Sequence, residues 1–455
     1  MHERVVSLPD PESRSLHLRE CEERHVDLTR AEAEWLQRAH SRHLSLARRP
    51  GSERTWLVRA GHVCGLIALP GGRRLCVEPR VAVRNVWTML AAAEGLDCLR
   101  WPPSAGETPR GLVDGLMHVF VREVETLIAH GVDVDYQRCE RILSRVRGEI
   151  DVHRQVRKLP GTFDRFACRF AELSRETPEN RMLTAALQVI ARVAAPHSDL
   201  RAAATRCMRE IGCSVRAELE HHELAAARVD AATRHYRIPM ALARLLVQGL
   251  GAGHRPVAGY HATKTPSLLV EMPRLFERFM CHVLQRSISG QARVRSRGHS
   301  VALDDGSHAM LTPDAVVEGP RGPLCVVDAK YKPESIDRHE PSASDLYQML
   351  AYCIGYRVRH AVLVYPRSVS ADPVRITRDG LSATIHPLGI DLSADAHSLR
   401  PFGELLAGQI AELVGLPGAA TGRCSLSDTL TESGTAGEGL HRRWAKTCCA
   451  DQHRR

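Results

Sequence analysis

Three polar residues between positions 311 and 333 have the types and the spacing that metal chemistry requires. Asp314 is followed fourteen positions later by Asp328, and Lys330 stands two residues further on. Because residues two apart on a strand face the same side, Asp328 and Lys330 are predicted to share a face. Asp328 lies in an apolar run, where a carboxylate without a partner is costly to bury. A divalent metal ion held between the two aspartates is the simplest explanation.

The sequence around these residues predicts a β-hairpin that brings them together. Ala315 to Gly319 is a short run rich in β-branched residues, and Leu324 to Tyr331 is a second apolar run. Pro320-Arg321-Gly322 between them is typical of a turn. Asp314 stands where the first strand begins, so the hairpin can place it beside the end of the second strand.

Helices before and after the hairpin carry further polar candidates. Glu277 lies at the flank of an apolar stripe on the preceding helix, and Gln348 and Tyr352 stand one turn apart on the following helix. His360 to Pro366 is a third apolar strand. The order helix, strand, strand, helix, strand predicts an α/β core with a mixed sheet.

The oxygen atoms of this group suit Mg²⁺, with Mn²⁺ as a substitute. Mg²⁺ prefers oxygen ligands in octahedral geometry and keeps several waters. Asp314, Asp328 and the backbone carbonyl of Ala329 would supply three oxygens, and Glu277 would be a fourth ligand or a contact to a bound water. A metal in such a site activates water and neutralises charge on a phosphate ester.

The remaining polar residues fit hydrolysis of a phosphodiester. Lys330 would orient or deprotonate the attacking water and stabilise the developing negative charge. Gln348 and Tyr352 would hydrogen-bond the phosphate or hold the lysine in place. The alternative is a structural ion pair between Asp328 and Lys330, and the joint pattern of motifs favours catalysis over it.

Composition sets broad limits on the class of protein. The 455 residues carry a net charge of +9, mostly from arginine, which suits phosphate contact but also follows from a GC-rich genome. Aromatic residues make up only 4%, which argues against a base-stacking platform. The charged start of the chain and the absence of a long apolar run predict a soluble, cytoplasmic protein without a membrane partner. The 14 cysteines show no CxxC pair and no ligand-like spacing with histidine, so structural zinc is not expected.

Changes in pattern along the chain predict five segments. Short strands and a Pro-Gly-Gly turn follow a polar start that has one helix near Leu28 to Leu46, and Gly249 to Gly259 is a flexible break. The predicted segments are a polar N-terminal segment (1–50), a mixed β/α partner-docking domain (51–160), a helical middle region (161–255), the α/β domain with the candidate site (256–415) and a disordered tail (416–455).

The motifs of the α/β domain resemble those of the PD-(D/E)xK nuclease superfamily, and most closely those of the McrC family. McrC is the nuclease subunit of modified-cytosine-dependent (Type IV) restriction systems. The matching residues are Pro313-Asp314, Asp328 to Lys332, Asp345 to Tyr352 and the LFERF sequence around Glu277. The resemblance implies a Mg²⁺-dependent endonuclease with a PD-(D/E)xK core that acts on double-stranded, modified DNA of the 5-methylcytosine type.

The resemblance extends into the N-terminal half and implies a partner protein. Gly65 to Arg80, the RGEID sequence at Arg147 and the ENRML sequence at Glu179 are similar to McrC segments. In that family a McrB-like AAA+ GTPase or ATPase ring recognises modified DNA, and the N-terminal domain of McrC docks on it and stimulates its hydrolysis. This chain has no GxxxxGK[ST] motif, so no nucleotide is expected to bind to it through a P-loop.

Two other functions remain open at this stage. The chain could be a non-catalytic activator or scaffold of a ring NTPase, although three retained polar groups at the site argue against this. It could also be a repair-type or transposon-associated nuclease of the same superfamily. The cation-rich segment from Arg138 to Arg169 is a candidate surface for DNA or for the partner, with a solvated loop as the alternative.

Overall fold

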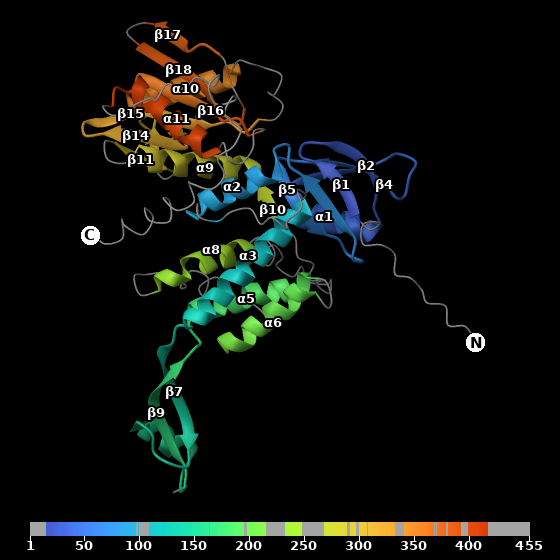
Figure 1. Cartoon of the computed structure of the whole chain (residues 1–455), viewed down its shortest axis with the longest axis vertical. Coiled ribbons are helices and arrows are strands. Elements are labelled where there is room, and N and C mark those ends of the chain that lie inside the picture. Colours follow the sequence, from blue (N-terminus) through green and yellow to red (C-terminus); the bar gives the residue numbers. More distant parts are fainter. Residues whose placement is uncertain are drawn as a thin grey trace, which may run out of the picture.

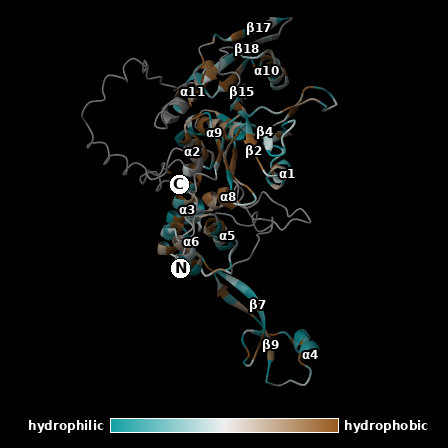
Figure 2. Ribbon diagram, turned by 90° about the vertical axis from the view of Figure 1, so that its right-hand side faces the viewer, coloured by the Kyte–Doolittle hydropathy of each residue, from teal (hydrophilic) through white to brown (hydrophobic). Residues whose placement is uncertain are grey.

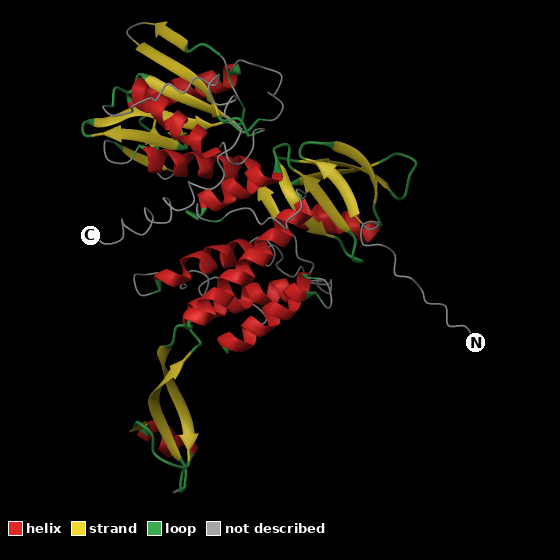
Figure 3. Cartoon of the chain, viewed as in Figure 1, coloured by secondary structure: helices red, strands yellow, loops and turns green. Residues whose placement is uncertain are grey.

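A computed structural model gives the arrangement of the chain (Figure 1). The structure describes residues 15–96, 99, 109–162, 164–194, 198–214, 233–247, 268–288, 292–296, 300–306, 308–332, 341–367, 369, 371–378, 381–392 and 399–416. The chain runs from a unit of small sheets, through a group of helices that carries a long β-arm, to an α/β unit (Figures 1 and 3). None of the described helices is long and apolar enough to cross a membrane.

Small sheets flanked by helices make up the N-terminal unit. Its elements are β1 (Ser15–Arg19), β2 (Glu23–Asp27), α1 (Arg30–Ala39), β3 (Leu44–Arg48), β4 (Thr55–Ala60), β5 (Val63–Ala68), β6 (Arg74–Glu78) and α2 (Val83–Ala93). In the described part of the chain, β2-β4-β3 form one sheet, and β1-β6-β5 form another with β10 (Leu268–Glu271). The predicted hairpin at the Pro-Gly-Gly turn is confirmed as β5 and β6. Gly71 and Gly72 have φ of 88° and 86° there, which glycine adopts without strain.

The start of the chain contains more regular structure than the sequence predicted. The single helix expected near Leu28 to Leu46 is present as α1, and a capping box of Thr29 and Glu32 fixes its start. In addition, β1 pairs with β6, and β2 and β3 pair with β4. The expectation of a polar segment with one helix is therefore wrong for residues 15–50. Strands β1, β2 and β3 each bury only one residue. Their sequences therefore lack the alternation of apolar and polar residues that indicates a strand.

A group of helices follows, and a long β-arm projects from it. The elements are α3 (Pro109–His130), β7 (Asp135–Leu143), β8 (Glu149–Ile150), α4 (Val152–Lys158), β9 (Phe166–Ser174), α5 (Pro178–Val193), α6 (Asp199–Ile211), the 3₁₀ helix η2 (Arg234–Tyr236) and α8 (Arg237–Leu246). The predicted helix start at Thr177 and Pro178 is confirmed, because the Thr177 side chain caps α5.

We call residues 133–174 the arm. Its strands β7 and β9 pair antiparallel along their whole length, and β8 pairs with β9. Figures 1 and 2 show the arm extending away from the helices, with α4 toward its far end. The β-like stretch predicted from Arg147 to Phe170 is correct for β8 and β9 but wrong for α4. The Asp151 carboxylate starts that helix by accepting a hydrogen bond from the Arg154 N–H at 3.0 Å.

Asn180 connects the base of the arm to the helices through its amide. Its side-chain nitrogen donates to the carbonyls of Asp133 and Arg175 at 2.9 and 2.8 Å. Its side-chain oxygen accepts a hydrogen bond from the Tyr236 hydroxyl at 2.8 Å. Asn180 is completely buried, so water cannot replace its amide as a hydrogen-bond partner of these groups unless the structure rearranges.

Replacing Asn180 with alanine is expected to lower the free energy of unfolding by about 3 kcal/mol, because buried hydrogen-bonding groups lose their partner. Tyr236→Phe removes a single hydroxyl and is expected to cost about 1 kcal/mol. Thermal and urea unfolding of the two variants measures both losses. Equal, negligible losses would contradict a structural role for this hydrogen-bond network.

The C-terminal α/β unit is built on a mixed sheet. Its elements after β10 are α9 (Met272–Ser287), β11 (Arg293–Ser296), β12 (Val301–Ala302), β13 (Met310–Leu311), β14 (Ala315–Gly319), β15 (Gly322–Ala329), α10 (Ala343–Tyr356), β16 (His360–Tyr365), β17 (Val374–Arg378), β18 (Leu381–Gly389) and α11 (Leu399–Leu413). In the described residues the sheet order is β11-β14-β15-β16-β18-β17. The predicted hairpin is confirmed as the antiparallel pair β14–β15, and the predicted third strand is β16, parallel to β15. This mixed α/β arrangement agrees with the predicted order of elements.

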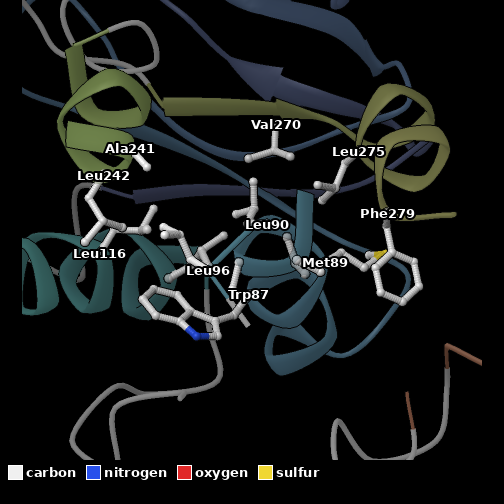
Figure 4. Packing of buried hydrophobic residues seen from close by; sticks show 14 of the residues in the cluster. Trp87, Met89, Leu90, Leu96, Leu116, Ala241, Leu242, Val270, Leu275 and Phe279 are labelled. Atoms are coloured by element: carbon white, nitrogen blue, oxygen red, sulfur yellow. The ribbon is translucent and has the colours of Figure 1, made fainter. Parts of the chain in front are cut away.

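The N-terminal and C-terminal units share one hydrophobic core. Strand β10 pairs with β5 of the N-terminal sheet and leads directly into α9 of the C-terminal unit. Helix α2 packs against α9, and Figure 4 shows Trp87 and Leu90 of α2 in the same cluster as Val270, Leu275 and Phe279. Close burial of these side chains fixes the N-terminal sheet relative to the strands that carry the candidate site.

The segment boundaries predicted from the sequence remain predictions. The flexible break predicted at Gly249 to Gly259 lies outside the described residues, as does the predicted tail from residue 417 onward. Several strand pairings join predicted segments: β1 to β6, β2 and β3 to β4, β7 and β8 to β9, and β10 to β5.

Candidate active site

Asp314 lies against the end of the neighbouring strand. It directly precedes β14, and its Oδ2 accepts a hydrogen bond from the Ala329 N–H at 2.8 Å. Ala329 is the last residue of β15, so its backbone lies beside the Asp314 carboxylate. The hairpin therefore places Asp314 beside the end of the second strand, as the sequence predicted. Asp314 and Ala329 are in direct contact although they are 15 positions apart.

Asp328 and Lys330 form a buried ion pair at this strand end. The Asp328 side chain is almost inaccessible, at 4% relative exposure, and its Oδ2 lies 2.6 Å from Lys330 Nζ. This contact is a direct ion pair, and Oδ2 has no further hydrogen-bond partner among the described residues. Burial raises the pKa of Asp328, and the Lys330 ammonium acts in the opposite direction.

A chain of hydrogen bonds from α10 holds the Lys330 ammonium. Lys330 Nζ donates to Gln348 Oε1 at 2.6 Å, and Gln348 Nε2 donates to the Tyr352 oxygen at 2.8 Å. The Tyr352 hydroxyl in turn donates to the Thr312 carbonyl at 3.2 Å, just ahead of Asp314. Burial and the charge of Asp328 raise the pKa of Tyr352 to about 12, so it stays a donor at neutral pH. This geometry favours the holding role that the sequence left open for Gln348 and Tyr352.

Glu277 lies on α9, half-buried, one helical turn before Cys281. The Cys281 thiol donates to the Asp314 carbonyl at 3.4 Å. Burial, together with the charges of Asp314 and Asp328, raises the pKa of this thiol to about 12. Cys281 therefore borders Asp314, and Glu277 lies one turn away on the same helix. Glu271 is the last residue of β10, directly before α9. Its carboxylate contacts His43 Nε2 at 3.0 Å.

Two contacts of the same motif were not predicted from the sequence. Lys332 Nζ lies 2.6 Å from Asp345 Oδ1, and Asp345 also bonds to Ser342, the residue that caps α10. The Ser-x-x-Asp spacing is a capping signal that could have indicated this role for Asp345. The Tyr331 hydroxyl donates to Glu20 Oε2 at 3.0 Å, across 311 positions of sequence, and no local pattern indicates that contact.

The donor set fits a hard divalent cation. Two carboxylates converge on the end of β15, where the Lys330 ammonium pairs with the buried Asp328 oxygen. Buried carboxylates are costly unless cations neutralise them, and a divalent ion would add to the positive charge that Lys330 supplies. Oxygen donors of this kind suit Mg²⁺ or Mn²⁺ rather than a soft metal.

The fold and the site define a mixed α/β protein that gathers two carboxylates and a lysine at the end of one strand pair. The chain belongs to the family described as McrBC 5-methylcytosine restriction system component, whose model matches residues 58–366. The McrC resemblance predicted from the motifs is thereby confirmed.

Several known proteins are similar to this chain in sequence or in fold. The Type IV methyl-directed restriction enzyme EcoKMcrBC of Escherichia coli (strain K12) is 21% identical over 308 residues, which are 64% of this chain and 87% of the relative. A solved half-complex from a tetradecameric assembly of Thermococcus gammatolerans McrB AAA+ hexamers with bound McrC contains a chain of similar fold. The TM-score is 0.58 at 18% identity, over 87% of this chain and 100% of that chain. A chain of the Thermococcus gammatolerans McrBC complex gives a TM-score of 0.42 at 18% identity, over 62% and 89%.

Proposed function

We propose that this chain is the Mg²⁺-dependent DNA endonuclease subunit of a modification-dependent restriction complex, with a PD-(D/E)xK core in its C-terminal unit. The observation that carries the proposal is the buried Asp328–Lys330 ion pair with Asp314 bonded to the same strand end. Membership of a restriction-system family supports modified double-stranded DNA as the substrate. The similarity to a structure that joins McrC to McrB AAA+ hexamers supports a ring NTPase as the partner.

Each residue of the site has a part in the proposed mechanism. Asp314, Asp328 and the Ala329 carbonyl would hold Mg²⁺, with Glu277 as a further ligand or a water contact. When bound, the ion supplies Lewis-acid activation of water and neutralises charge on the phosphate. Lys330 orients the attacking water and offsets the negative charge that develops on the phosphate.

Gln348 and Tyr352 act on the lysine rather than on the phosphate. The hydrogen bond from Lys330 Nζ to Gln348 Oε1 fixes the ammonium, and Tyr352 fixes the amide. A lysine that is held in one position needs less reorganisation when charge develops beside it, which is the basis of electrostatic preorganisation.

The arm is the proposed contact for the partner. Most of the exposed large apolar side chains in the described residues lie on it: Val134, Tyr136, Ile142, Val146, Ile150, Val152, Val156 and Leu173. Four of the arm's eight arginines form ion pairs within it, and in two of these Arg147 lies 3.0 Å from Glu172 and Arg169 lies 2.8 Å from Asp151. Exposed apolar side chains, together with partial pairing of the arginines, favour a protein partner over DNA.

Metal titration of the isolated chain tests the nuclease proposal without partner or substrate. Calorimetry with Mn²⁺ is expected to detect binding by the wild type and its loss in the Asp314→Ala/Asp328→Ala double variant. The exposed pair Asp305 and Asp372 provides the matched control, and Asp305→Ala/Asp372→Ala is expected to bind as the wild type does. Equal, negligible binding by wild type and double variant would favour the scaffold alternative.

The same titration has a predicted pH dependence. Asp328 must be ionised to bind a cation, and burial raises its pKa from the ordinary value of about 4. Mn²⁺ affinity is therefore expected to increase as pH rises through that raised pKa, at higher pH than for an exposed aspartate. An affinity that is already independent of pH in the acidic range would contradict a role for Asp328 as ligand.

A further inference from the structure

A second group of metal-ligand atoms lies where the N-terminal unit meets Tyr331, just past the end of β15. Glu20, Cys21 and His62 each offer one ligand atom, and these atoms all lie within 4.8 Å of one another. Cys21 Sγ is 3.2 Å from His62 Nδ1, and Glu20 Oε1 is 3.8 Å from the same nitrogen. The sequence did not indicate this cluster, because 41 positions separate Cys21 from His62. Spacing along the sequence could therefore not indicate that these three side chains lie together.

The backbone holds all three residues in place. Glu20 N–H donates to the Glu78 carbonyl at 2.8 Å, and Cys21 N–H donates to the Gly61 carbonyl at 3.2 Å, next to His62. Cys21 has φ of 59°, a left-handed conformation that costs energy for a residue with a side chain. Such strain persists only where the surroundings fix it, and it concentrates at functional positions.

The Glu20 carboxylate has one oxygen that lacks a hydrogen bond. Glu20 is completely buried, and its Oε2 accepts hydrogen bonds from the Arg80 N–H at 3.2 Å and the Tyr331 hydroxyl at 3.0 Å. Its Oε1 accepts none within the described part of the chain, and it is the oxygen that faces His62. Burial raises the pKa of Glu20, which reflects the cost of holding its charge there. A cation beside Oε1 would offset that cost.

We propose that Glu20, Cys21 and His62 form a binding site for Zn²⁺ or a similar borderline-soft divalent ion. Thiolate, imidazole and carboxylate are the ligands that Zn²⁺ uses in proteins. Zn²⁺ bonds to sulfur at about 2.3 Å and to nitrogen and oxygen at about 2.1 Å, so tetrahedral ligand atoms stand roughly 3.3–3.6 Å apart. The observed separations of 3.2 and 3.8 Å lie on either side of that range. On binding, the Cys21 thiol releases its proton to solvent, and His62 binds through Nδ1 in its neutral form.

This site differs from the candidate nuclease centre in ligand chemistry and in position. The nuclease centre offers oxygen atoms, which suit Mg²⁺ and Mn²⁺, whereas sulfur and nitrogen select Zn²⁺ and Co²⁺. The two are linked through Tyr331, which follows Lys330 and bonds to Glu20. An ion at Glu20 would therefore tie the N-terminal sheet to the end of the active-site strand. The inference does not depend on the nuclease proposal.

Cobalt titration of the metal-stripped full chain tests this site by a thiolate signal, which the carboxylates of the nuclease centre do not give. We expect about one equivalent of Co²⁺ to produce the near-ultraviolet thiolate-to-cobalt charge-transfer band, and Zn²⁺ to abolish it by displacement. The band should survive in Asp314→Ala/Asp328→Ala and disappear in Cys21→Ser. Cys139→Ser is the matched control, since Cys139 also lies near a carboxylate, 3.9 Å from Glu172, and this variant should keep the band.

Two more variants separate loss of a ligand from loss of the fold. Cys21→Gly removes the sulfur but suits the positive φ, so it should fold at least as well as wild type and still lack the band. Glu20→Gln keeps an acceptor for Arg80 and Tyr331, and it should weaken Co²⁺ binding at least as much as the ~10–100-fold typical of supporting residues. No band in the wild type, or a band that persists in the folded Cys21→Gly protein, would overturn the proposal.

Discussion

Replacing Asp328 with alanine will lower DNA cleavage by the assembled complex by about 10³-fold or more, because the loss of a metal ligand removes several kcal/mol of transition-state stabilisation and each 1.4 kcal/mol is a factor of ten. Stimulation of the partner NTPase should remain, since Asp328 lies on β15, in a different unit from the arm. Cleavage and NTP hydrolysis measured on the same reconstituted complex give both results. Loss of the two activities together would contradict separable roles for the arm and the strand end.

The neighbouring lysines provide a matched comparison for the same assay. Lys330 and Lys332 each lie 2.6 Å from an aspartate, Asp328 in the first case and Asp345 in the second. Lys330→Met should reduce cleavage to nearly the level of the Asp328 variant. Lys332→Met removes a contact to the start of α10 and should change cleavage by less than about tenfold, or 1.4 kcal/mol. Similar losses from both would mean that the motif needs positive charge in general rather than an ammonium held at Gln348.

The contacts among Asp314, Asp328, Lys330, Gln348 and Tyr352 could be predicted in part because they depend on strand and helix periodicity and on one hairpin. Asp328 and Lys330 share a face since strand side chains alternate, and the hairpin turn fixes which residue of the next strand end meets Asp314. Gln348 and Tyr352 meet because residues four apart on a helix are neighbours. The observed contacts at 2.6 and 2.8 Å follow those two periodicities.

Contacts between distant segments had no such signal. Tyr331 and Glu20 belong to different units, and only the shared packing of α2, α9 and β10 brings them together. Helix α4 was missed for a different reason. It has only seven residues, too few to show an apolar period, and it buries none of them. Its capping residue, Asp151, was the one local indication of a helix start.

The exposed face of α4 will be required for partner binding. Val152 and Val156 are 68% and 69% exposed, and they stand four residues apart, so they lie on one face of the helix. Such apolar side chains gain free energy when a partner covers them. The double substitution Val152→Asp/Val156→Asp is therefore expected to weaken binding to the ring NTPase by about 100-fold or more, since central interface residues are each worth about 2 kcal/mol. Stimulation of its hydrolysis should fall in parallel.

An exposed apolar residue outside the arm provides the control for the Val152→Asp/Val156→Asp variant. Leu405 of α11 is 50% exposed, and Leu405→Asp should leave partner binding unchanged. The arm variant should keep wild-type Mn²⁺ binding, because α4 and the end of β15 belong to separate units of the fold (Figure 2). If the arm variant binds the partner normally but loses affinity for DNA in a salt-dependent manner, the arm is a DNA surface instead, because phosphate contacts weaken as salt rises. The exposed apolar side chains of the arm, and the pairing of four of its eight arginines with Glu140, Asp151 and Glu172, make the partner contact the expected result.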